Sequence, residues 1–237
     1  MRVAALSDIH GNLPALEAVL ADVEGESVDA IVVGGDTVSG PWPAEVFDRV
    51  VAVGARMVRG NADRLEEVAR HDSSLGAWNA DHLGRARLAT VAEWPLTLEV
   101  DVDGLGKVLV CHATPESDEP IYTRITPDNE VAALLGPVDA DVVICGHTHM
   151  QYDRKLSNGL RLVNPGSVGM PYEGRRGAFW ALLGPDVEFR HTEYDVDATV
   201  ESIRVLGAPV SERLLELQLD PLDSDTATAE FEKIRAA

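Results

Sequence analysis

The 237-residue sequence has little cysteine, few aromatic residues and few basic ones. Its two cysteines, Cys111 and Cys145, lie inside apolar runs, which predicts buried thiols and excludes a disulfide framework. Aromatic residues make up 5%, and 20 lysines and arginines stand against 40 aspartates and glutamates, for a formal net charge of -20. Such a chain repels polyanions, so we expect no nonspecific binding of nucleic acid.

Long apolar runs are also missing. The N-terminus turns polar at Ser7, after too few apolar residues for a signal-peptide core or a membrane span. This favours a soluble, cytoplasmic protein with no membrane partner. The sequence also lacks internal repeats and Gly/Ser-rich linkers, and its 45% apolar content suffices for a substantial core. We therefore expect one domain over residues 1–237.

Short apolar runs separated by turn residues predict buried strands in the first two thirds of the chain. Helical patterns lie between several of them, the clearest beginning with Asn12 as its N-cap and Pro14 in its first turn. The expected strands are 3–6, 30–33, 57–58, 108–111, 142–145 and 160–163, and the expected helices are 13–23, 43–53, a third around 65–68, 78–91 and one starting at 126–127.

Closely spaced strands are expected after His149, at 152–156, 160–163, 179–183 and 187–192, and they resemble a β-meander. The first turn is Ser157-Asn158-Gly159, and the segment 164–167 is interpreted as a turn that closes the second sheet. From residue 195 onward two short amphipathic helices precede a polar, acidic end, which is expected to fray.

Metal-ligand side chains follow five of these strands directly, where ligands gather in α/β sheets. These donors are Asp8, His10, Asp36, Asn61, His112, His147 and His149. Seven nitrogen and oxygen donors exceed the needs of one ion but suffice for two ions that share a bridging carboxylate. Imidazole with carboxylate favours Mn, Fe, Zn, Ni or Co. Gly34, Gly35, Gly60 and Gly146 precede these donors where backbone must approach an ion closely.

The order and spacing of Asp8-x-His10, Gly35-Asp36, Gly60-Asn61, His112 and Gly146-His147-Thr148-His149 resemble the calcineurin-like metallophosphoesterase superfamily. Over residues 1–190 the chain is most similar to its small single-domain prokaryotic phosphodiesterases, and the C-terminal helices of 195–237 follow. The resemblance implies an α/β (α+β by some schemes) four-layer αββα sandwich, with two mixed β-sheets flanked by helices.

The resemblance also implies a division of the ligands between two divalent ions, with Mn²⁺ favoured. Asp8, His10 and His149 hold the first ion, Asn61, His112 and His147 hold the second, and Asp36 bridges them. Asp36, Asn61 and His112 count as catalytic residues. The reaction implied is hydrolysis of a small phosphate ester, favouring diesters, by a metal-activated hydroxide.

One position departs from the family pattern, because Ala62 stands where many members carry a histidine that serves as general acid or stabilises charge. This favours leaving groups of low pKa, or another acid among Asp63, Arg64, His71 and His82. A lone histidine such as His71, His82 or His191 is more typical of local hydrogen bonding.

Substrate contacts are predicted at Asn12, Arg64 and Arg175, although helix capping also explains Asn12 and solvation also explains Arg175. A non-catalytic metal-binding interaction module on the same fold stays open as an alternative. A phosphatase for monoesters or proteins and a dinucleotide polyphosphate hydrolase also stay open, as does homo-oligomer formation.

Overall fold

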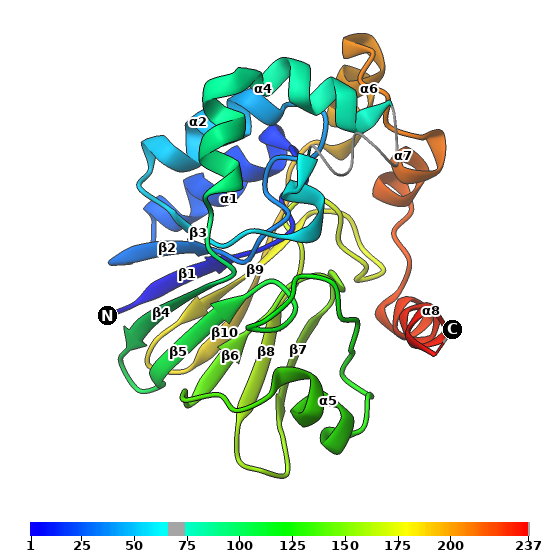
Figure 1. The fold of residues 1–237 in the computed structure, drawn as a ribbon. Helices are drawn as coiled ribbons and strands as arrows, with labels where there is room; N and C mark the ends of the chain where they lie inside the picture. The colour runs from blue at the N-terminus through cyan, green and yellow to red at the C-terminus, as the bar shows by residue number, and fades with distance from the viewer. Residues whose placement is uncertain (66–73, 237) are drawn as a thin grey trace.

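Two five-stranded mixed sheets form the centre of the computed structural model, which describes residues 1–65 and 74–236 (Figure 1). The first sheet has the order β10-β9-β1-β2-β3 and the second has the order β4-β5-β6-β8-β7. The strands of the first are β1 (Val3–Leu6), β2 (Ala30–Val33), β3 (Arg56–Met57), β9 (Ala178–Leu183) and β10 (Val187–Thr192). Those of the second are β4 (Thr97–Val102), β5 (Gly106–Cys111), β6 (Val142–Ile144), β7 (Gln151–Lys155) and β8 (Arg161–Pro165).

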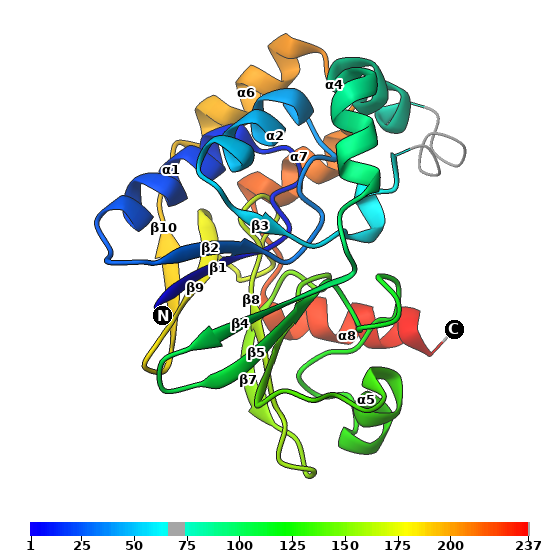
Figure 2. The same cartoon turned by 60° about the vertical axis from the view of Figure 1, so that its left-hand side comes forward.

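The sheets pack face to face, and helices cover both outer faces, so the fold is the expected αββα sandwich (Figures 1 and 2). On one side lie α1 (Leu13–Glu24), α2 (Pro43–Ala52), α4 (Leu75–Ala92) and α6 (Val196–Leu206). On the other side lies α5 (Asp128–Leu135). The prediction of two mixed sheets between helices is confirmed.

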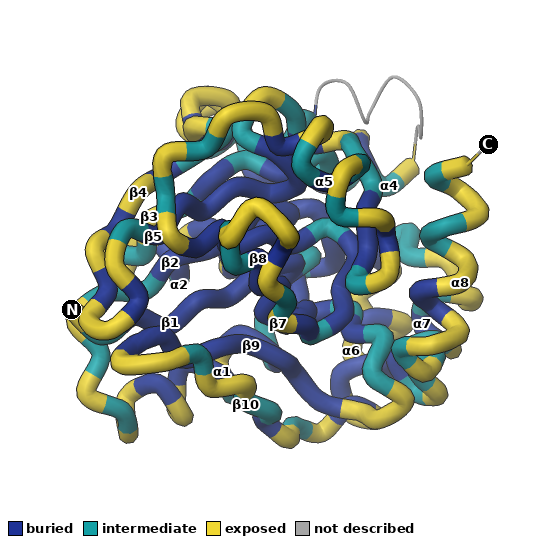
Figure 3. The backbone as a smooth tube through the Cα atoms, turned by 90° about the horizontal axis from the view of Figure 1, so that it is seen from below, coloured by how far each residue is buried: buried dark blue, intermediate teal, exposed yellow. Residues whose placement is uncertain are grey.

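Alternating residues of β1 and β5 belong to different cores, which explains why these strands are almost wholly apolar. Val3 and Ala5 of β1 face the second sheet, whereas Ala4 and Leu6 pack against α1. In the same way β5 divides its residues between the inter-sheet core and a cluster under α5. Figure 3 shows the buried strands enclosed by partly exposed helices.

The predicted helix ends are largely confirmed. Asn12 caps α1 by accepting a hydrogen bond from the backbone of Ala15 at 3.2 Å. The fourth predicted helix is α4, but Gly84 has φ 68° and ψ 164°, so two helical pieces meet there at a kink. The expected helix around 65–68 falls largely outside the described residues.

Two predictions about strands and tail are wrong, and one strand is absent from the predictions. The strand β4 was missed, although Leu98, Val100 and Val102 alternate with polar residues as a half-buried strand requires. The strands after His149 form two hairpins that join different sheets, so they are not a meander: β7-β8 extends the second sheet and β9-β10 the first. The acidic end does not fray, because after α7 (Glu212–Leu219) it forms α8 (Ser224–Arg235), capped by Asp223.

The C-terminal helices are packed onto the rest of the fold. Val196, Val200 and Ile203 of α6 form a cluster with Leu215 of α7, and Trp42 and Trp78 pack against it. This contact joins the C-terminal segment to the start of α2 and to α4. Among the described helices none is both long and apolar enough to cross a bilayer.

Candidate metal centre

The seven predicted ligands lie at neighbouring strand ends. The parallel pairs β1-β2 and β5-β6 bring the residues that follow those strands to one edge of each sheet. Ligand atoms then form two groups, each within 4.8 Å: Asp8, His10, Asp36 and His149 in one, and Asp36, His112 and His147 in the other. Asp36 belongs to both groups, as the bridging position requires.

The first group is closely packed. His149 Nε2 lies 3.2 Å from both Asp8 Oδ1 and His10 Nε2, and His10 Nε2 lies 3.7 Å from Asp36 Oδ2. Asp8 is completely buried, while His10 is half-buried. The group therefore has an inner wall and one side that meets solvent.

The side-chain amide of Asn61 lies beside the second group, where the family resemblance implies a ligand. His112 Nε2 lies 3.0 Å from Asn61 Oδ1, 3.2 Å from His147 Nδ1 and 3.4 Å from Asp36 Oδ2. His112 is 1% exposed, whereas Asn61 and His147 are half-buried. Both groups thus open to solvent on one side, which a substrate needs.

Backbone carbonyls fix which imidazole nitrogens face inward. His112 Nδ1 and His149 Nδ1 donate to the carbonyls of Gly34 and Met170 at 2.8 Å, and His147 Nε2 donates to that of Glu119 at 3.2 Å. In these tautomers the other nitrogens present lone pairs to the groups. When both rings are neutral, as metal binding requires, lone pairs from His112 and His147 face each other at 3.2 Å, beside two oxygen acceptors. A divalent cation satisfies all of them, so the donor set fits a metal.

Charges on neighbouring side chains decide the direction of the pKa shifts. Burial lowers the pKa of His112, but Asp36 outweighs it and raises that pKa to about 10. Burial raises the pKa of Asp36, but His112 outweighs it and brings that pKa below its usual range. Burial and then the charge of His112 lower the pKa of His147 to about 4. His112 and Asp36 therefore hold a proton that a metal ion must displace.

Backbone conformation singles out the same residues. Among the described residues other than glycine, positive φ occurs at five positions, and all five are predicted ligands: Asp8 (53°), His10 (48°), Asp36 (51°), His147 (69°) and His149 (60°). A left-handed conformation is costly for a residue with a Cβ atom. Such strain typically gathers at functional sites, where the surrounding structure maintains it.

Glycines make room for the ligands, as the sequence suggested. A Cβ atom on Gly146 would lie 2.0 Å from Ser7 Oγ and 2.6 Å from Asp8 Oδ2. The segment 164–167 also supports this loop, because Asn164 Nδ2 donates to Gly146 O at 2.7 Å and Ser167 Oγ donates to Asp8 O at 2.8 Å. The turn thus ties loops from both sheets together, a role that its composition alone did not reveal.

Asp63, one of the four candidate acids, is buried and accepts hydrogen bonds from the backbone. It is 2% exposed, and Oδ1 accepts from the backbone of Thr37 at 2.9 Å and of Val38 at 3.1 Å. Its Oδ2 accepts from the backbone of Gly60 at 3.0 Å. Burial and then the charge of Asp36 raise the pKa of Asp63 to about 7. Asp63 therefore joins the Asn61 loop to the Asp36 loop, and its position three residues after Gly60, from which a carboxylate can accept from Gly60 N, was the available signal.

Asp63→Asn is expected to weaken metal binding without touching a ligand. Asparagine retains one acceptor oxygen but turns an amide donor toward Gly60 N, so the Asn61 loop must shift. We expect Mn²⁺ affinity to fall about 10- to 100-fold and stability to fall by about 1–3 kcal/mol. Calorimetric Mn²⁺ titration and urea unfolding measure the two effects, with the exposed Asp81→Asn as control. Wild-type Mn²⁺ affinity in Asp63→Asn would show that the hydrogen bonds of Asp63 are not needed for metal binding.

The predicted substrate contacts lie in different surroundings. Asn12 is 1% exposed, and besides its capping bond its Nδ2 donates to Gly169 O and Tyr194 Oη at 3.2 Å. Arg64 follows the Asn61 turn and binds Glu119 at 2.7 Å and Asp118 at 3.3 Å. Arg175 is exposed, with its guanidinium 5.1 Å from the ring centre of Phe179. Of these three, only Arg64 combines a position beside a ligand loop with partial exposure.

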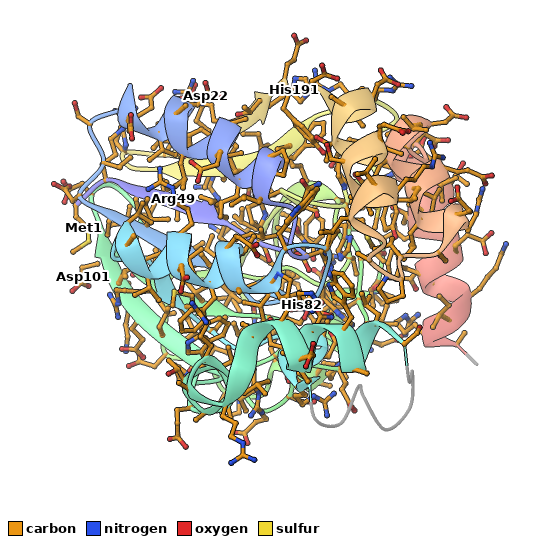
Figure 4. The ribbon with its side chains drawn as sticks, turned by 90° about the horizontal axis from the view of Figure 1, so that it is seen from above. Met1, Asp22, Arg49, His82, Asp101 and His191 are labelled. Atoms are coloured by element: carbon orange, nitrogen blue, oxygen red, sulfur yellow. The ribbon has the colours of Figure 1, made fainter. Side chains whose placement is uncertain are left out.

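Of the three remaining histidines, the two that the structure describes lie outside the metal centre. His82 stacks on Trp78 with ring centres 3.8 Å apart, and His191 contacts the carbonyl of Arg176 at 2.8 Å. Figure 4 shows these two histidines well apart, on α4 and β10. His71 lies outside the described residues. Both cysteines are buried free thiols, as predicted.

Residues 1–183 match the family described as the calcineurin-like phosphoesterase superfamily domain. The chain belongs to this superfamily. Its members are metal-dependent, which agrees with two groups of carboxylate and imidazole atoms that share Asp36. The superfamily domain covers both sheets except for β10 and ends before α6.

Individual superfamily relatives match most of the chain. An uncharacterised protein of Methanocaldococcus jannaschii, MJ0912, is 27% identical in an alignment 228 positions long, which covers 85% of this chain and 91% of that protein. The phosphodiesterase YfcE of Escherichia coli K12 is 26% identical in an alignment 199 positions long, which covers 79% of this chain and 89% of YfcE. The crystal structure of a metallophosphoesterase from Sphaerobacter thermophilus has a TM-score of 0.73 and 29% identity, and covers 93% of this chain and 98% of that one.

Proposed function

We propose that this phosphoesterase hydrolyses small phosphodiesters at a centre of two divalent ions. The first ion would be held by Asp8, His10 and His149, and the second by Asn61, His112 and His147, with Asp36 shared. The single observation that carries the proposal is the position of Asp36, which is 3% exposed and lies in both groups of ligand atoms. One carboxylate serving two cation sites is the arrangement that a two-metal hydrolase needs.

Backbone hydrogen bonds hold the imidazole ligands in place before a metal binds. Carbonyls of Gly34, Met170 and Glu119 fix three imidazole rings, so little reorganisation is needed on metal binding. Two bound ions supply Lewis acidity and lower the pKa of a coordinated water. Imidazole with carboxylate favours Mn, Fe, Zn, Ni or Co, and the resemblance to the superfamily favours Mn²⁺ among them.

Charge around the centre favours diesters over monoesters. The chain has a formal net charge of -20, and the nearby Arg64 is paired with Asp118 and Glu119. Two bound divalent ions would offset this field at the centre itself, but on its approach a dianionic monoester meets more repulsion from the rest of the chain than a monoanionic diester does. The proposal further includes a cytoplasmic location, one domain over 1–237 and no nonspecific affinity for nucleic acid.

The leaving group is expected to depart with little help from a proton donor. Ala62 offers only its backbone N–H, which donates to Asp36 Oδ1 at 2.8 Å. Loss of a general acid costs about 10²–10⁴ in rate when the leaving group needs a proton. The enzyme is therefore suited to esters whose leaving oxygen has a low pKa.

Hydrolysis by chelator-stripped protein tests the proposal. We expect added Mn²⁺ to restore turnover of bis-p-nitrophenyl phosphate, to give slower turnover of p-nitrophenyl phosphate, and to leave dialkyl phosphates at least about 10²-fold slower. Turnover without metal would contradict the proposal that the reaction depends on metal. Equal rates for aryl and alkyl esters would contradict the proposal that no general acid assists the leaving group.

A second candidate function is a non-catalytic metal-binding interaction module, and Ala62 is the observation that favours it. The same experiment separates the two functions. A protein that binds Mn²⁺ but turns over neither monoesters nor diesters would support the module.

A further inference from the structure

The C-terminal helix α8 brings an aromatic side chain toward the metal centre. The Tyr172 ring stacks on the imidazole of His149, with ring centres 5.2 Å apart and planes 12° from parallel. Phe231 of α8 then packs on Tyr172 with ring centres 6.1 Å apart. A row of rings therefore leads from a proposed ligand of the first ion to α8, which lies beyond the matched domain 1–183.

Specific contacts hold α8 in this place. Gly174 N donates to Leu222 O at 2.9 Å just before the helix, and Thr228 Oγ1 lies 3.4 Å from Met150 Sδ. Thr123 Oγ1 donates to Glu232 at 2.7 Å. Met150 directly follows His149, Thr123 lies in the loop after His112, and Gly174 lies in the loop between β8 and β9. Figures 1 and 2 show α8 on the same side as α5. The helix α8 is therefore held by specific contacts to loops near the first group of ligand atoms.

The two aromatic rings keep some surface for a ligand. Tyr172 and Phe231 are half-buried, whereas Phe179 and Trp180 of the core are fully buried. Burial and then the charge of Asp8 raise the pKa of Tyr172, which agrees with a place beside the first ligand group. In a chain of net charge -20, an aromatic surface also offers binding energy that does not depend on positive charge.

We propose that Tyr172 and Phe231 form a subsite for a planar aromatic ring carried by the substrate, either an aryl group or a nucleobase. This inference rests on the proposed function for the position of phosphorus at the metal centre. Phe231 is a specificity-determining residue in this arrangement. Flat rings bind such a surface by offset stacking, and a saturated ring of similar size does so less well.

Calorimetric binding of two phosphonates to the Mn²⁺-loaded full chain tests the subsite. Phenylphosphonate and cyclohexylphosphonate carry the same charged group and resist hydrolysis, so their affinity ratio isolates the flat ring. We expect the wild type to prefer the phenyl compound about 2- to 12-fold. The preference should disappear in Phe231→Ala and in Phe231→Leu, which retains apolar packing, and should persist in Ile234→Ala, an exposed position on the same helix.

Equal affinities in the wild type, or a preference that survives both Phe231 variants, would overturn the subsite. Turnover of bis-p-nitrophenyl phosphate in the same preparations separates this failure from failure of the proposed function, because phosphonate binding needs no turnover. Uridine 5′-monophosphate and ribose 5-phosphate form the second arm. A Phe231-dependent preference for the nucleotide identifies a nucleobase, and a preference confined to phenylphosphonate identifies an aryl group close to phosphorus.

Discussion

Asp36→Asn is expected to lower phosphodiester turnover by a factor on the order of 10²–10³ or more. Asp36 Oδ2 lies 3.4 Å from His112 Nε2 and 3.7 Å from His10 Nε2, between the two ligand groups. The neutral amide retains one oxygen acceptor but loses the charge that opposes the repulsion of two cations. We therefore expect metal content to fall from about two ions per chain to about one.

Metal analysis and steady-state kinetics check this expectation, with Asp101→Asn as the matched control. Asp101 is an exposed residue of β4, distant from the ligand loops, and the same chemical change there should leave both quantities unchanged. Two ions per chain together with near wild-type turnover in Asp36→Asn would rule out a bridging role for this carboxylate.

Gly60→Ala is expected to disable the centre by crowding alone. A Cβ atom on Gly60 would lie 2.1 Å from Asp36 Oδ1 and 2.3 Å from Asp36 N, far inside contact distance. Alanine tolerates the Gly60 backbone angles, φ -100° and ψ 172°, so the steric overlap is the main cost. Displacement of Asp36 should lower turnover about 10²-fold, and overpacking should cost about 1–3 kcal/mol of stability.

Gly54→Ala provides the contrasting variant. Gly54 has φ 67°, and no atom lies within 4 Å of the position its Cβ would occupy. Only conformational strain of about 1–2 kcal/mol is expected there, with turnover unchanged. Urea unfolding and hydrolysis assays on the pair separate crowding from strain, and equal turnover in both variants would refute the crowding argument.

The sequence predicted the parts of the fold that depend on local pattern. Apolar runs located β1 and β2 with the observed ends, because both strands are buried on two faces. The same criterion overlooked β4, whose alternating residues are buried on one face only. Nothing local distinguishes a meander from two hairpins in different sheets, since long-range pairing of β8 with β6 and of β9 with β1 decides it.

The candidate ligands were predictable because their order along the chain is distinctive, and the structure brings Asp8, Asp36 and His147 into the expected groups. Their supports were not predictable. The carbonyls of Gly34, Met170 and Glu119 carry no side-chain signature, and the position of α8 depends on contacts between residues about a hundred positions apart, such as Glu130 with Arg235.

At the five proposed ligands with positive φ, backbone conformation and metal binding favour different residues. Glycine would adopt the positive φ of Asp8, His10, Asp36, His147 and His149 without the steric cost of a Cβ atom. Metal binding needs the same side chains. These five positions therefore combine a backbone conformation that costs folding stability with side chains that the proposed metal centre needs.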